Sequence, residues 1–236
     1  MSYSFESKIR YSEVDPDAKL TWIKLLDYFQ DASVFQSESL DLGVRFLGER
    51  HLCWVLNSWQ ICLNRMPKLY EDVVITTLPY EIGGFFGKRN FTMDTKDGER
   101  LAYANSFWTL IDIQNDRPHK VLHEMDAYGC DEKLDMDYCD RKLKLPEAMA
   151  SAEPISVTRH LLDTNGHVNN GRYVELALGL LPDGYQVKEV RAEYKMQAHE
   201  GDVFYPKTKD EGDQYTVALL NEAGKVYCTV QFLKAQ

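Results

Sequence analysis

The chain has few of the features that anchor a protein in a membrane or brace it covalently. No apolar run approaches the roughly 18 residues of a membrane helix, and Met1–Arg10 lacks the hydrophobic core of a signal peptide. Five cysteines, an odd number without Cys-x-x-Cys spacing, argue against a disulfide or zinc framework. We therefore expect a cytoplasmic protein whose cysteines are buried free thiols.

Candidate metal ligands are scarce as well. His119 and His123 stand four residues apart, a spacing that places two ligands on one face of a helix. Pro118 and the strand-like residues before it favour a solvated loop instead. We expect neither a metal nor a cofactor.

Basic residues are outnumbered by acidic ones. Lys and Arg total 27 against 37 Asp and Glu, which gives a net charge of −10. This balance, together with the lack of a basic stripe interleaved with aromatic residues, disfavours nucleic acid and anionic membranes as partners. An acidic partner would have to bind a local basic cluster. The candidate clusters are Arg141–Lys144, Lys188 with Arg191 and Lys195, and Lys207 with Lys209.

The segment Leu162–Tyr173 is the most informative part of the sequence. In it Asp163, Asn165 and His167 alternate, so an extended segment would project an acid, an amide and an imidazole to one side. Residues 155–161 read as a strand and residues 173–181 as a helix stopped by a proline. We expect Asn169 or Asn170 to cap this helix, whose first free amides would face any developing charge.

The alternative is a polar loop whose Asp and Asn side chains bond their own backbone. A second copy of the segment argues against that reading as the full explanation. Residues 11–22 align with residues 159–170 at an offset of 148, which pairs Asp15 with Asp163 and Lys19 with His167. A second sequence repeat pairs residues 65, 66, 72 and 73 with residues 195, 196, 202 and 203, at an offset of 130. Only the second copy carries an imidazole suited to acid-base chemistry.

The remaining pattern predicts one helix wrapped by an antiparallel sheet, twice in succession. With 236 residues and 44% hydrophobic content, the chain can bury two cores of ordinary size. The first helix begins at Thr21 and stops at Gly43. The expected strands are 53–61, 72–80, 87–95, 101–113, 187–197, 202–207, 215–220 and 226–233. We place the first domain at 1–130, a linker at 131–153 and the second domain at 154–236.

These residues carry a resemblance to a known family. The order of elements resembles a tandem hotdog fold, an α+β architecture. Asp163-x-Asn165-x-His167 followed by Asn169, Asn170 and Tyr173 resembles the active-site motif of acyl-ACP thioesterases. A second motif, Glu193-Tyr194-Lys195-Met196-Gln197-Ala198, resembles the Glu-Tyr-Arg-Arg-Glu-Cys strand of that family, and Trp108 before Arg117-Pro118 also fits. The resemblance implies that Asp163, Asn165 and His167 are the catalytic residues.

Two positions depart from the family pattern. The active-site glutamate of the family falls on Gln197, and its neighbouring cysteine falls on Ala198. A cysteine nucleophile at that position is excluded. We expect Gln197 to be a neutral hydrogen-bonding residue, with Asn169 and Asn170 as further supporting residues.

The resemblance implies hydrolysis of acyl-ACP, with release of free fatty acid in fatty-acid biosynthesis. Asp163 and His167 would activate water, Asn165 would orient it, and backbone amides near Asn170 would polarise the carbonyl. The partner would be acyl carrier protein bearing an acyl chain on 4'-phosphopantetheine. We expect the first domain to hold the acyl chain. Its candidate pocket residues are Trp22, Leu25 and Phe29, which equally suit a plain core.

Two other functions stay open on this fold. One is hydrolysis of acyl-CoA, which would need contacts to a nucleotide instead of a basic docking patch. The other is a catalytically silent acyl-binding protein in which Gln197 has removed activity. The lack of a Ser- and Arg-rich leader resembles the bacterial branch of the family. Because the duplication supplies both domains, a single chain is expected to be a competent unit, and a homodimer of such chains stays open.

Overall fold

The computed structural model describes residues 1–163 and 165–234. The chain divides into two compact units. Unit 1 comprises Met1–Asn57 and Ile61–Tyr138, and unit 2 comprises Ser58–Gln60 and Cys139–Gln236. None of the helices in the described part of the chain has the length and apolar character needed to span a bilayer.

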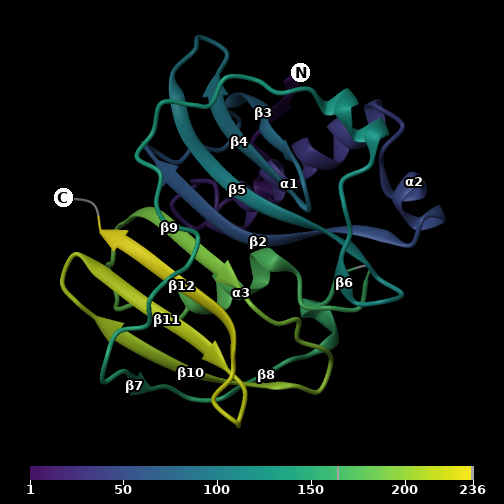
Figure 1. The fold of residues 1–236 in the computed structure, drawn as a ribbon. Coiled ribbons are helices and arrows are strands. Elements are labelled where there is room, and N and C mark those ends of the chain that lie inside the picture. The colour runs from purple at the N-terminus through teal and green to yellow at the C-terminus, as the bar shows by residue number, and fades with distance from the viewer. Residues whose placement is uncertain (164, 235–236) are drawn as a thin grey trace. The chain divides into compact units, whose positions relative to one another are not determined.

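Unit 1 is a helix packed on one face of an antiparallel sheet (Figure 1). Its strands follow the order β1-β3-β4-β5-β2, with β6 paired to β5. The long helix α1 (Trp22–Ser39) packs on β1 and β3, and a short helix α2 (Val44–Glu49) follows it. Two 3-10 turns, η1 (Tyr11–Glu13) and η2 (His123–Tyr128), complete the unit. The strands are β1 (Tyr3–Lys8), β2 (Leu52–Leu63), β3 (Asp72–Gly83), β4 (Phe86–Thr95), β5 (Arg100–Asp112) and β6 (Arg117–Pro118).

Alternation along β3 and β4 sets the core of unit 1. Val73 and Ile75 are buried on one face of β3, as the period of two requires. On α1, Leu25 and Phe29 are each 0% exposed, and the ring of Phe29 lies 5.3 Å from that of Phe91 on β4. The apolar stripe of the helix therefore meets the apolar face of the sheet.

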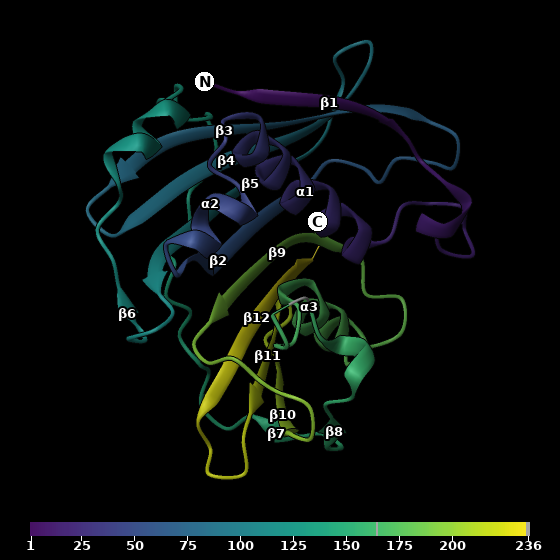
Figure 2. The same ribbon diagram turned by 90° about the vertical axis from the view of Figure 1, so that its right-hand side faces the viewer.

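Unit 2 repeats this arrangement on a smaller scale (Figure 2). Its strands follow the order β9-β12-β11-β10-β7, with β8 paired to β10, and helix α3 (Asn170–Leu178) packs on β11 and β12. A 3-10 turn η3 (Arg159–Leu161) precedes the helix. The strands are β7 (Ala150–Ser151), β8 (Ile155–Ser156), β9 (Val187–Tyr194), β10 (Val203–Asp210), β11 (Gln214–Leu220) and β12 (Val226–Lys234).

The element boundaries depart from the sequence prediction where tertiary hydrogen bonds end an element. The strand expected to reach Gln197 stops at Tyr194, because the next two amides both donate to the carbonyl of Tyr227, at 2.8 and 3.3 Å. The first helix ends at Ser39, and Gly43 instead precedes α2 as its N-cap residue. The Glu38 carboxylate occupies the space that a Cβ at position 43 would need, which explains the glycine.

The second copy of the motif shows similar departures. The strand expected over 155–161 is reduced to β8, and the last three residues of that stretch form η3. Helix α3 begins at Asn170 instead of Tyr173 and ends at Leu178 instead of Leu181. It has 9 residues against 18 in α1, so the helix of unit 1 is the longer one.

The segment predicted as a linker is held by specific contacts in each unit. In unit 1 the side-chain oxygen of Asn90 accepts the amide of Leu134 at 3.1 Å and the hydroxyl of Tyr138 at 3.0 Å. In unit 2 the amide of Leu143 donates to Glu193 at 2.9 Å. The five cysteines, all within the described residues, are thiols that are not joined in disulfides, as predicted. Only Cys228 is buried, however, and Cys130 is exposed, so the expectation of uniformly buried thiols was wrong.

Candidate active site

The motif loop from Leu162 to Val168 is closed by its own hydrogen bonds. The amide of Asp163 donates to the carbonyl of His167 at 2.7 Å, and Leu162 pairs with Val168 as an isolated antiparallel bridge. Oδ1 of Asp163 accepts the amides of Asn165 at 2.8 Å and His167 at 3.3 Å. The loop is an Asx turn, so the backbone-bonding interpretation holds for this oxygen.

The structure brings the three motif residues together through the backbone. Within residues 1–163 and 165–234, no hydrogen bond joins the side chains of Asp163, Asn165 and His167 to one another. Asn165 is exposed, whereas Asp163 and His167 are half-buried. The carboxylate of Asp163 is therefore turned into the loop. The imidazole of His167 and the side-chain amide of Asn165 remain for other partners.

An equivalent loop is present in unit 1. Oδ1 of Asp15 accepts the amides of Asp17 at 2.9 Å and Lys19 at 3.0 Å, and the amide of Asp15 donates to the carbonyl of Lys19 at 2.8 Å. Both loops place a positive φ at the same position, 59° at Ala18 and 77° at Gly166. The duplication predicted at an offset of 148 residues is confirmed at the level of hydrogen bonds.

The second sequence repeat, between residues 65–73 and 195–203, is confirmed, but its register differs from the predicted one by one residue. In each unit, two consecutive amides share one carbonyl as they leave a strand. These amides are Asn64 and Arg65 on Leu101 in unit 1, and Lys195 and Met196 on Tyr227 in unit 2. Position 195 therefore corresponds to 64 and not to 65. The offset is 131, and the predicted offset of 130 was wrong.

The corrected register makes Lys68 the counterpart of His199. The amide of Lys68 donates to Oε2 of Glu71, and the amide of His199 donates to Oδ2 of Asp202, both at 2.9 Å. Sequence reasoning missed His199. An offset of 131 in place of 130 would have aligned it with a residue beside the first loop.

His199 lies against the imidazole of His167. Their ring centroids are 4.8 Å apart with an interplanar angle of 75°, an edge-on contact. Nδ1 of His199 lies 4.0 Å from Oδ2 of Asp202. Asp202 also contacts Tyr227, whose pKa is raised by burial and, to a lesser extent, by this carboxylate. The site thus contains a row of carboxylate, imidazole and imidazole.

The start of α3 is capped as the sequence predicted. The Asn169 side chain accepts the amide of Gly171 at 2.8 Å, which confirms it as the N-cap residue. The amide of Arg172 donates to the carbonyl of Asn169 at 2.9 Å. Gly171 is therefore engaged, and the amide of Asn170 is left as the first-turn donor without a partner among the described residues.

Two tyrosines, the buried Tyr173 and the half-buried Tyr194, hold the loop and the helix in place. The hydroxyl of Tyr194 donates to the carbonyl of Asn170, and the hydroxyl of Tyr173 accepts the amide of Ala198, both at 2.9 Å. The amide of Val168 donates to the carbonyl of Ala198 at 2.9 Å. Burial raises the pKa of both tyrosines well above the usual range, so they stay neutral and serve as hydrogen-bonding struts.

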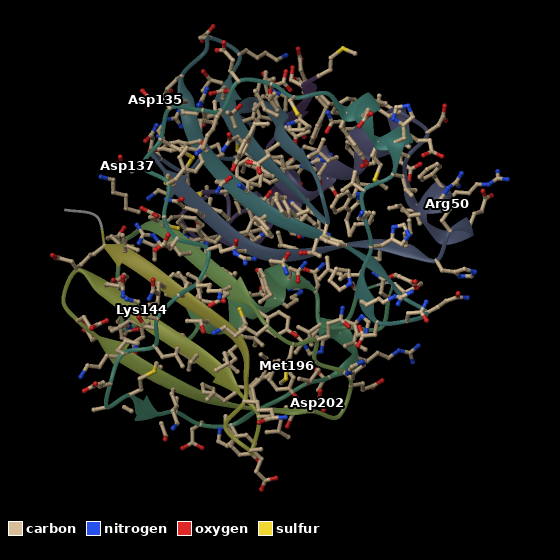
Figure 3. All side chains as sticks on the ribbon, in the orientation of Figure 1. Arg50, Asp135, Asp137, Lys144, Met196 and Asp202 are labelled. Carbon is tan, nitrogen blue, oxygen red and sulfur yellow. The ribbon has the colours of Figure 1, made fainter. Side chains whose placement is uncertain are left out.

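Gln197 lies in the connection between β9 and β10, which Figure 3 marks with labels at Met196 and Asp202. Its side chain is exposed and forms no hydrogen bond to the described residues. The strand on which we expected it ends three residues earlier. The structure therefore does not join Gln197 to the motif loop.

The pocket residues predicted from the sequence lie on α1 in unit 1. Leu25 and Phe29 are fully buried and Trp22 is half-buried. His119 is half-buried and His123 exposed, in different segments of the chain that follows β5. No group of three or more His, Cys, Asp or Glu side chains within the described ranges is arranged to hold a metal ion.

The fold and the site define a tandem hotdog protein of the thioesterase type. Residues 1–128 match the acyl-ACP thioesterase N-terminal domain, and residues 146–233 match the acyl-ACP thioesterase C-terminal domain. The chain belongs to the acyl-ACP thioesterase family. The recognition made from the motif and the predicted fold are both confirmed.

Solved structures and curated relatives agree with this assignment. An acyl-ACP thioesterase from Bacteroides thetaiotaomicron superposes with a TM-score of 0.91 at 24% identity, covering 99% of this chain and 98% of that one. A putative oleoyl thioesterase from Lactobacillus plantarum gives 0.84 at 25% identity, covering 100% and 97%. A palmitoyl-acyl carrier protein thioesterase from Cuphea hookeriana is 30% identical over 74% of this chain and 45% of its own length. The chain spans about half the length of the curated plant relatives it matches.

Proposed function

We propose that this protein hydrolyses the thioester of acyl-ACP, releasing free fatty acid and holo-ACP in fatty-acid biosynthesis. The observation that carries the proposal is the pair of equivalent loops. Both keep the aspartate that folds the loop, but only the loop of unit 2 carries an imidazole, and it precedes α3. The names of the relatives support the substrate class.

In the proposed reaction a water molecule attacks the carbonyl carbon of the thioester. Oδ1 of Asp163 is engaged by two amides, whereas the ring nitrogens of His167 form no hydrogen bond to the described residues. We therefore assign to His167 the role of general base, which takes a proton from the attacking water. The negative charge of Asp163 stabilises the imidazolium that forms. When the carbon–sulfur bond breaks, the imidazolium returns the proton to the departing thiolate.

The other groups orient and polarise the substrate. Asn165 is exposed beside the imidazole position in the loop and orients the water or the thioester. The amide of Asn170, at the start of a helix, donates to the carbonyl oxygen as it becomes an oxyanion. Asn169 supports this donor by capping the helix, and Gln197 contributes at most a neutral hydrogen bond.

We assign chain-length selection to unit 1 and chemistry to unit 2. The apolar face of α1, with Trp22, Leu25 and Phe29, is the candidate wall of the acyl site. The partner surface must be basic, since the carrier protein is acidic and this chain carries a net charge of −10. In unit 2, Arg191 and Lys195 are paired with Glu189 and Glu193. The segment 141–144 and the β10 lysines 207 and 209 are further docking candidates.

Steady-state hydrolysis of an acyl-ACP series, measured beside the matching acyl-CoA series, tests the proposal. We expect turnover of acyl-ACP that depends on chain length, and a higher KM for acyl-CoA. A preference for acyl-CoA would identify coenzyme A, and not acyl carrier protein, as the carrier in the true substrate. Binding of acyl-ACP without turnover would identify a silent acyl-binding protein. Conversion of enoyl or hydroxyacyl thioesters without hydrolysis would indicate a dehydratase instead.

A further inference from the structure

We propose that His199 is a positioning residue for His167, and that it couples the charge of Asp202 to the reacting imidazole. The inference rests on the proposed thioester hydrolysis. It assigns to the connection between β9 and β10 the carboxylate that Gln197 no longer supplies. The juxtaposition that carries it is the row Asp202, His199 and His167, in which each group contacts the next.

The geometry of His199 is fixed from both ends. Its amide donates to Oδ2 of Asp202 at 2.9 Å, and its Nδ1 lies 4.0 Å from the same oxygen. Its ring meets that of His167 edge-on at 4.8 Å between centroids. The amide of Val168, next to His167, donates to the carbonyl of Ala198, next to His199, at 2.9 Å. The backbone therefore holds the two rings in contact.

Unit 1 shows that the scaffold alone brings these two positions together. The residues equivalent to His167 and His199 are Lys19 and Lys68, which face each other as an isolated antiparallel bridge. Both lysines are exposed. The fold thus needs no histidine at either position. Among the residues that the structure describes, the two imidazoles in contact lie in unit 2, where we place the proposed chemistry.

The row acts on the charge that His167 acquires. When His167 takes a proton from water, the imidazolium is stabilised by a carboxylate that reaches it through the ring of His199. The ring contact also restricts the rotamers of His167, so that its nitrogen points to the attacking water. Other titratable groups that face the row are Asp163 in the same loop, Tyr173 on α3 and Tyr227 on β12.

Three substitutions separate the parts of this proposal. His199→Ala removes the ring, His199→Phe keeps an aromatic edge without the nitrogens, and Asp202→Asn removes the charge while its side-chain oxygen still accepts the amide of position 199. We expect each to lower kcat about tenfold or more while KM changes little, as for loss of a group that acts in the transition state. Lys68→Ala, the equivalent change in unit 1, is the matched control and should leave kcat unchanged.

Chemical rescue supplies a readout that a packing role would not give. Free imidazole in the buffer should restore part of the turnover of His199→Ala, because the position is exposed and the ring leaves a gap. It should not rescue His199→Phe, which fills the gap.

The outcomes distinguish this inference from the proposed function. If the wild-type protein hydrolyses no thioester, the function fails, and the contact is then tested by the ring-nitrogen NMR signals of His167, which should shift in Asp202→Asn but not in Lys68→Ala. Normal turnover in His199→Phe, or turnover of His199→Ala that imidazole does not raise, would reduce His199 to a packing residue.

Discussion

The duplicated loop allows the fold and the chemistry of Asp163 to be measured separately. Oδ1 of Asp163 accepts two amides, at 2.8 and 3.3 Å. Oδ1 of Asp15 accepts the two equivalent amides, at 2.9 and 3.0 Å. Both aspartates are half-buried. Replacing either one by alanine therefore removes the same two bonds from the same kind of loop, but only one of the loops carries an imidazole.

The expected loss of stability follows from these bonds. At about 1 kcal/mol for each hydrogen bond, either alanine variant should lose about 2 kcal/mol of unfolding free energy. For a chain of this size that lowers the melting temperature by about 4 to 8 °C. The asparagine variants keep an oxygen that accepts both amides, so Asp15→Asn and Asp163→Asn should melt within about 2 °C of the wild type.

The variants at Asp163 should lose activity, whereas those at Asp15 should not. Asp163→Ala and Asp163→Asn should both lower kcat for acyl-ACP by about 100-fold or more, the scale of a positioned acid-base group. Asp15→Ala and Asp15→Asn should retain wild-type kcat at a temperature where all four variants are folded. The assay is steady-state turnover beside a calorimetric melting curve. If Asp163→Asn keeps wild-type turnover, Asp163 is a structural loop residue and its assigned role in catalysis is refuted.

Three further predictions concern Gln197, the acyl site and the thiols. Because Gln197 is exposed, Gln197→Glu should preserve or raise turnover and Gln197→Ala should weaken it only slightly; complete loss in the alanine variant would contradict this. Leu25→Trp should shorten the preferred acyl chain if it narrows the acyl site; destabilisation by about 1–3 kcal/mol with an unchanged product profile would place the site elsewhere. Burial raises the pKa of the Cys228 thiol, so alkylation at neutral pH should reach Cys130 first and leave turnover intact; inactivation in step with Cys130 labelling would count against a thiol-independent mechanism.

The long elements were predictable because their burial follows a simple period. In β3, buried and partly exposed residues alternate, and the predicted start at Asp72 is the observed one. In α1 the buried residues Leu25, Phe29 and Ala32 recur at helical spacing on the face that meets the sheet. A period of two or of 3.6 residues is a local property, so a single sequence reveals it.

The connections were less predictable because partners distant in sequence decide them. The carbonyl of Tyr227 ends β9 by accepting two successive amides. No residue near Tyr194 in the sequence indicates that the strand ends there. The carboxylate of Glu38 requires a glycine at position 43, which the local pattern presents as a helix stop. The offset of 130 predicted for the second repeat, instead of 131, was a further error in a connection. Because of this shift by one residue, the sequence alignment did not pair His199 with Lys68.

The comparison of the two loops also changes how the motif should be read. The aspartate is common to both units, and in each it bonds the amides two and four residues ahead. Folding alone therefore accounts for an aspartate at this position. The imidazoles at 167 and 199 replace lysines that the equivalent fold accepts without difficulty, so folding does not account for them. The residues that the scaffold does not need are the ones most informative about chemistry, and in this chain they are the two histidines.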